Sequence, residues 1–138
     1  MITLPHALHF ALRANARAGR ICEERGERFD PLPVLKLFNP LGAATWIATE
    51  LDDDGGTLFG LADLGFGCPE LGSFSLREIA GVRLPFGLTI ERDIAFTPRA
   101  PLSVWAETAR RMGSILHAEQ ALRRASMPPG NPLPSTGG

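Results

Sequence analysis

The 138-residue chain has few cysteines, no long apolar run and no excess of basic side chains. No apolar stretch approaches the roughly 18 residues that a membrane-spanning helix needs, so no transmembrane segment is expected. The two cysteines, Cys22 and Cys68, form neither a disulfide framework nor a paired Cys/His pattern typical of zinc sites. We therefore predict free, partly buried thiols and no structural zinc.

The first 20 residues do not have the order of basic region, apolar run and small cleavage site that marks a signal peptide. Their charged side chains follow the apolar part instead of preceding it. On this basis we expect a cytoplasmic protein with no membrane association.

The charge is nearly balanced overall but uneven along the chain. The formal net charge is −1, and residues 50–93 hold nine Asp and Glu side chains against three arginines. A protein that grips the nucleic-acid backbone by itself usually shows a clear basic excess. Direct DNA binding is therefore weakly supported, and the acidic centre directs attention to carboxylate chemistry.

Residue patterns predict a helix followed by three strands in the first half of the chain. Helical spacing of apolar residues predicts a helix over residues 4–18, ended by Gly19. Alternation over residues 34–38 predicts a strand in which Lys36 faces away from its two leucine neighbours. A second strand over residues 44–51 would place Leu51 on the face of the preceding threonines.

An Asp-Asp-Asp-Gly-Gly sequence, typical of a hairpin connection, leads to a third strand over residues 57–64. Within this strand, Gly60 permits a bend or a close approach of a neighbouring backbone. A glycine-rich loop over residues 65–72 follows, and it has no Gly-Lys-Ser/Thr of a phosphate-binding loop. We expect its glycines to serve backbone shape.

The second half of the chain begins with a capping box, in which Ser75 starts a short helix and Glu78 lies three residues on. A last strand is expected over residues 88–96. A final helix begins at Ser103 and continues after a weak point at Gly113.

These elements predict one α+β domain over residues 1–125. Its sheet is mostly antiparallel with about four strands, accompanied by N-terminal, short central and C-terminal helices. Residues 126–138 are rich in proline and glycine and are expected to form a disordered tail.

Carboxylates near the predicted strand ends suggest a catalytic site. Asp63 and Glu70 bracket the glycine-rich loop, and Glu91 and Asp93 share a face of the last strand. If the four side chains converge, they would be catalytic residues of a phosphodiesterase, with Asp63 and Glu70 holding Mg²⁺ or Mn²⁺. The alternative is that these acids form ion pairs and cap loop amides, with no cofactor.

Three further residues are candidates for binding. Lys36, the only lysine, and Arg92 could hold a phosphate group. Trp46 could anchor a partner surface, because tryptophan is common at interface centres, or it could belong to the core. The expected partner is a protein or a protein–nucleic-acid assembly.

Several short motifs are similar to those of a small bacterial domain family of unknown function, frequently encoded on plasmids and other mobile elements. They are residues 36–38 (KLF), 44–46 (ATW), 63–67 (DLGFG), 69–72 (PELG) and 91–93 (ERD). The resemblance covers residues 12–113 and implies a role linked to plasmid or mobile-element biology, without an activity to transfer.

Two functions therefore remain open, and the sequence does not decide whether the protein is an enzyme. We predict an uncharacterised accessory protein that acts as a non-enzymatic binding module. The alternative is a divalent-metal-dependent nuclease or other phosphodiesterase that uses the clustered carboxylates.

Overall fold

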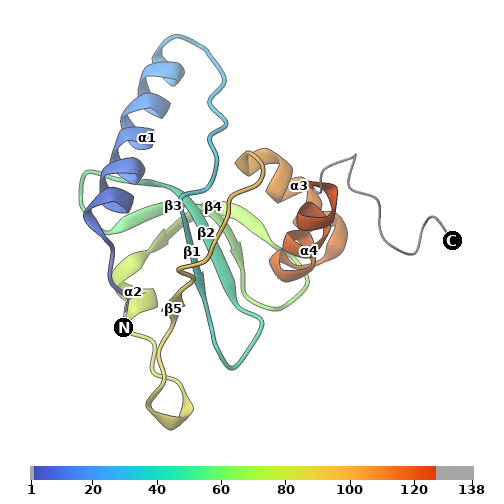
Figure 1. The fold of residues 1–138 in the computed structure, drawn as a ribbon. Coiled ribbons are helices and arrows are strands. Elements are labelled where there is room, and N and C mark those ends of the chain that lie inside the picture. Colours follow the sequence, from blue (N-terminus) through green and yellow to red (C-terminus); the bar gives the residue numbers. More distant parts are fainter. Residues whose placement is uncertain (1, 127–138) are drawn as a thin grey trace, which may run out of the picture.

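A five-stranded antiparallel sheet with helices on both faces forms the centre of the structure (Figure 1). The computed structural model describes residues 2–126. The strands are β1 (Leu35–Phe38), β2 (Thr45–Leu51), β3 (Thr57–Asp63), β4 (Glu70–Ser75) and β5 (Glu91–Arg92). The helices are α1 (His6–Glu24), α2 (Leu76–Ala80), α3 (Leu102–Met112) and α4 (Ile115–Ala125), with a 3-10 turn η1 (Pro85–Gly87). The predicted α+β class is confirmed, with one strand more than expected.

The strand order is β4-β3-β2-β1-β5, and every neighbouring pair is antiparallel. The first four strands follow one another as a meander, which short connections allow. The chain then passes α2 and returns, so that β5 lies beside β1 with Leu37 opposite Arg92. β4 and β5 are therefore the two edge strands.

Each face of the sheet carries its own apolar core. On one face, Leu35 and Leu37 of β1 pack with Leu12 of α1 and Ile79 of α2. On the other face, strand residues pack with Trp105 of α3 and with residues of α4. Alternate strand residues point to opposite faces, so β1 sends its leucines to the α1 side and Lys36 to the α4 side, as predicted.

A β-bulge in β2 changes which residues face which core. The register with β3 shifts between Ala48 and Glu50, so that Thr49 is the extra residue. As a result Leu51 packs in the core on the α1 side. The expectation that Leu51 shares a face with the preceding threonines is wrong, because strict alternation does not hold across a bulge.

Gly60 lies opposite Ala48, next to this bulge. A Cβ atom at Gly60 would overlap the carbonyl oxygen of Ile47 and lie 2.8 Å from the Cα of Ala48. The predicted close approach of a neighbouring backbone is therefore present, and only glycine fits it.

Three predicted element boundaries differ from the structure. α1 continues through Gly19 to Glu24, and a Cβ at Gly19 would lie 3.2 Å from the Phe29 ring, so a glycine inside the helix allows this close packing. The glycine-rich stretch contains strand β4, which its glycines concealed. The last strand shrinks to β5, because the carboxylate of Asp93 accepts the Ala95 N–H and turns the chain away from the sheet.

The start of α2 and the end of α3 follow the sequence signals. The Ser75 hydroxyl accepts a hydrogen bond from the Glu78 N–H at 3.1 Å, as the capping box predicts. Gly113 has a φ of 81° and separates α3 from α4. None of the helices within residues 2–126 is long and apolar enough to cross a membrane.

The division into a domain over residues 1–125 and a tail over residues 126–138 stays a prediction. Of that tail, only Ser126 falls within the described residues.

Substitution Gly60→Ala is expected to lower the free energy of unfolding by about 3 kcal/mol or more, since backbone atoms must move to admit the methyl group. Urea denaturation followed by circular dichroism measures this. Its control is Gly72→Ala, at the residue of β4 that pairs with Gly60, where a Cβ would meet no atom within 4 Å. Equal losses in the two variants would contradict the close-approach explanation.

Candidate functional site

Lys36 is buried in a network of charged side chains. It is 6% exposed, and its Nζ lies 2.7 Å from Glu119 Oε1 and 3.2 Å from Asp93 Oδ2. These two ion pairs join β1 to α4 and to the segment after β5. A buried cation needs such partners, so Lys36 is already paired on both sides. Its predicted phosphate-binding role stays untested.

Asp63 is fully buried and binds the start of a helix. Its Oδ2 accepts a hydrogen bond from the N–H of Ile115 at 2.9 Å, at the first turn of α4. Its Oδ1 accepts one from the N–H of Gly65 at 2.8 Å. The negative charge is favourable there, because helix N-termini carry a partial positive charge. Through the two hydrogen bonds, the carboxylate of Asp63 connects β3, the following loop and α4.

The other predicted carboxylates point elsewhere. Glu70 pairs with Ala62, the neighbour of Asp63, so Glu70 and Asp63 point to opposite faces of the sheet. Glu91 is exposed on β5, at the far edge, and Asp93 pairs with Lys36. Within residues 2–126, no group of three or more His, Cys, Asp or Glu side chains is placed to hold a metal ion. The expected convergence is not found there.

The two remaining binding candidates also have structural contacts. Trp46 is 8% exposed and packs in the core on the α1 side. The Nε of Arg92 donates a hydrogen bond to the carbonyl of Thr3 at 3.0 Å. Of the two interpretations of Trp46, the structure therefore shows the core one.

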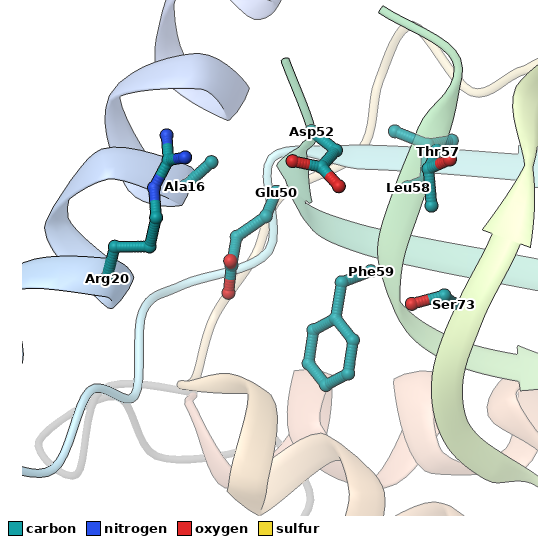
Figure 2. Close-up of a pocket in the computed structure, with 8 residues that line it drawn as sticks. All are labelled: Ala16, Arg20, Glu50, Asp52, Thr57, Leu58, Phe59 and Ser73. Carbon is teal, nitrogen blue, oxygen red and sulfur yellow. The ribbon is translucent and has the colours of Figure 1, made fainter. Parts of the chain in front are cut away.

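An open groove lies instead at the end of β2, between the C-terminal half of α1 and the N-terminal end of α3. It consists of two adjoining cavities of about 220 and 230 Å³, which share Glu50 and Phe59. We call it the Glu50 groove. The polar cavity is also lined by Ala16, Arg20, Asp52, Thr57, Leu58 and Ser73 (Figure 2). The apolar cavity is also lined by Arg28, Phe29, Asp30, Pro31, Leu71, Leu102 and Ser103.

The β2 bulge and a glycine of α1 together place Glu50 in this groove. After the bulge, Glu50 lies opposite Phe59, a residue that packs on the α3 side of the sheet. Gly19 of α1 has no side chain to fill the neighbouring space, since a Cβ there would lie 3.4 Å from Glu50 Oε1. Figure 2 shows the Glu50 carboxylate between α1 and the Phe59 ring.

Burial raises the pKa of Glu50 above its ordinary value of 4.5, and the nearby negative charge of Asp52 raises it further. Among residues 2–126, no side chain or amide hydrogen-bonds or pairs with the Glu50 carboxylate. Arg20, which lines the same cavity, lies 3.6 Å from Asp53 instead. Glu50 is therefore a half-buried anion that lacks a donor.

Glu50 is not one of the four acids that the sequence predicts to be catalytic, although it ends a strand beside them. Its signal in the sequence is weak: one acid at the end of an apolar strand, before three aspartates that read as a solvated hairpin. The bulge in β2 and the position of Gly19 beside Glu50 arise only when the chain folds.

The fold and the groove define a small three-layer α+β domain with an antiparallel sheet. A sequence model of the family described as "Protein of unknown function (DUF2958)" matches residues 3–116. The chain belongs to this family, which confirms the predicted membership of a domain family of unknown function. Comparison with curated proteins and with solved structures gives no match.

Substitution Asp63→Asn is expected to lower the free energy of unfolding by about 2 kcal/mol in metal-free buffer, because an amide has one acceptor oxygen for the two N–H donors of Gly65 and Ile115, of which the second is buried. Chemical denaturation measures this loss. The control Glu70→Gln is expected to stay within about 0.5 kcal/mol of the parent. A metal-ligand role would show the reverse pattern: both variants stable, and both without the Mn²⁺ binding of the parent in calorimetry.

The raised pKa of Glu50 makes stability depend on pH. The folded state binds the proton of the Glu50 carboxyl group more tightly than the unfolded chain does. The contribution of this proton to the free energy of unfolding is therefore fully present below pH 4.5 and is lost as the pH rises through the folded pKa. Glu50→Gln is expected to remove this component and to be at least as stable as the parent near neutral pH. Denaturation curves from about pH 4 to about pH 8 test this, with the exposed Glu91→Gln as control. A Glu50→Gln variant with an unchanged pH profile would contradict the assignment.

Proposed function

We propose that the protein is a non-enzymatic binding module, and that the Glu50 groove receives a basic side chain of a protein partner. The observation that carries this proposal is the half-buried Glu50 carboxylate, which has a raised pKa and no donor among residues 2–126. An anion removed from water without a partner costs free energy, and a cation that enters the groove recovers that cost.

A guanidinium group suits the polar cavity well. Its planar fork of N–H donors matches a carboxylate in two parallel hydrogen bonds. The Phe59 ring beside Glu50 offers an aromatic face, against which a cation or its aliphatic stem packs. The Ser73 hydroxyl and the Asp52 carboxylate provide further acceptors on the same wall. We therefore favour arginine, with lysine as a weaker ligand.

The composition of the groove supports binding over catalysis. Among residues 2–126, no Cys, His or Lys side chain lines either cavity. The Ser103 hydroxyl donates a hydrogen bond to Asp30, and this carboxylate also accepts the Ser103 N–H at 2.9 Å, so the pair stabilises the start of α3. The apolar cavity of the groove, lined by Phe29, Pro31 and Leu102, suits an apolar neighbour of the basic side chain.

The partner can belong to a protein–nucleic-acid assembly, since the interaction requires only a basic protein side chain. A link to plasmid or mobile-element biology stays a prediction from the family resemblance. The metal-dependent phosphodiesterase stays the alternative, with no convergent carboxylates within residues 2–126 to favour it.

Titration with N-acetyl-arginine amide tests the proposal. Saturable chemical-shift changes are expected at residues of the groove in two-dimensional NMR spectra. The isosteric but neutral N-acetyl-citrulline amide is expected to bind at least about tenfold more weakly, because it cannot form the charged pair.

The matched variants are Glu50→Gln, expected to weaken arginine-amide binding at least about tenfold, and Glu91→Gln, expected to leave it unchanged. Both remove one negative charge, but Glu91 lies on β5 at the edge of the sheet away from β4. Equal binding of the arginine and citrulline amides, or an equal effect of the two substitutions, would refute the proposed function.

A further inference from the structure

The two edges of the sheet differ in how they meet solvent. β5 has only two residues, both charged, and offers little backbone for pairing. β4 has six residues and pairs with β3 alone within residues 2–126. Its outer backbone groups therefore form a strand-length row without a neighbouring strand.

Beyond its first residue, β4 has little that blocks another strand. Natural edge strands are usually protected by charged side chains, proline or a bulge. In residues 70–75 the only charged side chain is Glu70 at the start of the strand, proline is absent, and the register with β3 is continuous. At the middle of the strand, a Cβ on Gly72 would meet no atom within 4 Å. A second backbone can therefore approach the strand centre.

The same strand lines both cavities of the Glu50 groove. Leu71 pairs with Leu61, and Ser73 pairs with Phe59, so both point to the α3 side of the sheet. Leu71 lines the apolar cavity and is 45% exposed, whereas Ser73 lines the polar cavity. Two residues along a strand are about 7 Å apart, and this is the spacing of alternate side chains in any extended chain.

On the basis of the proposed function, we infer that the partner binds as an extended peptide segment. This segment adds a sixth strand along β4. The segment carries an apolar and a basic side chain two positions apart. Backbone hydrogen bonds to β4 would supply general affinity, and the two side chains would supply specificity, as in other cases of strand addition.

The order of the cavities determines which side chain lies where. The side chain opposite Leu71 meets an apolar wall that includes Pro31 and Leu102, so an aliphatic residue fits it. The side chain opposite Ser73 passes over a small residue toward Phe59 and the acidic part of the groove. Glu50 lies on β2, three strand positions from the added strand, or about 14 Å at about 4.8 Å per strand. An extended arginine is therefore needed to approach its carboxylate, and a shorter basic side chain does not reach it.

Synthetic peptides test this inference. The first is an acetylated, amidated pentapeptide, threonine–arginine–threonine–leucine–threonine, in which an antiparallel strand, the pairing used throughout this sheet, places arginine opposite Ser73 and leucine opposite Leu71. The second has the same composition in the order threonine–arginine–leucine–threonine–threonine, which sends leucine and arginine to opposite faces of a strand. Calorimetry is expected to show at least about tenfold tighter binding of the first, and hydrogen exchange is expected to slow at amides of residues 70–75.

Backbone methylation and one matched pair of variants complete the test. N-methylation of two adjacent residues of the first peptide, one at a time, is expected to abolish binding in one position and spare it in the other, because strand N–H groups alternate in direction. Leu71→Asn is expected to weaken peptide binding at least about tenfold, because the leucine of the peptide loses its apolar neighbour without any change of charge. Leu41→Asn, at an exposed leucine in the β1–β2 turn, is expected to leave peptide binding unchanged.

The outcomes separate this inference from the proposed function. If arginine amide binds through Glu50 while the two peptides bind equally and the amides of β4 stay unprotected, strand addition is refuted and the groove proposal stands. If neither arginine amide nor peptide binds, both are refuted. Concentration-dependent self-association that protects residues 70–75 in the absence of peptide would assign the edge to a second copy of the chain, and would likewise overturn the inference.

Discussion

The close approach of β2 and β3 at Gly60 is the constraint on which the rest of the structure depends. It accommodates a bulge at Thr49, and the bulge turns Leu51 into the core on the α1 side while Glu50 points to the α3 side. Without that extra residue, the end of β2 would alternate regularly, and the carboxylate would lose its position beside Phe59. A local backbone irregularity thus determines both the packing of one core and the location of the groove.

The ionisable groups of the sheet divide into two kinds. Lys36 and Asp63 are buried with their partners in place, and both hold α4 against the sheet: one through Glu119, the other through the Ile115 N–H. Such groups are costly to bury but are fully satisfied, so they contribute to a unique arrangement of the helices. Glu50 is the opposite case, since it is half-buried and has no donor within residues 2–126. The contrast explains why Asp63, which is prominent in the sequence, is bound within the fold, and why the proposed groove is centred on a less conspicuous acid.

Much of the fold could be predicted from local patterns. Alternation located β1, β2 and β3, placed Lys36 opposite its leucine neighbours, and the Ser75 capping box marked the start of α2. The predictions failed where long-range contacts override local preference. β4 was concealed because its glycine and serines have low strand propensity, and it forms because β3 offers a full row of partners. Gly19 is a typical helix end by its sequence, yet α1 continues past it to Glu24, and the missing side chain leaves room for Phe29 and Glu50.

The sequence by itself determined the α+β class, the antiparallel character of the sheet, family membership and the candidate acids, because these depend on short-range periodicity and on recognisable motifs. Only the tertiary structure decided which acids are satisfied and that Glu50 is half-buried without a donor among residues 2–126. The physical reason is that the state of a carboxylate depends on its solvation and on donors far along the chain: Asp63 meets the N–H of Ile115, 52 residues away. No local pattern encodes such a contact, and the same holds for the bulge that directs Glu50 into the groove.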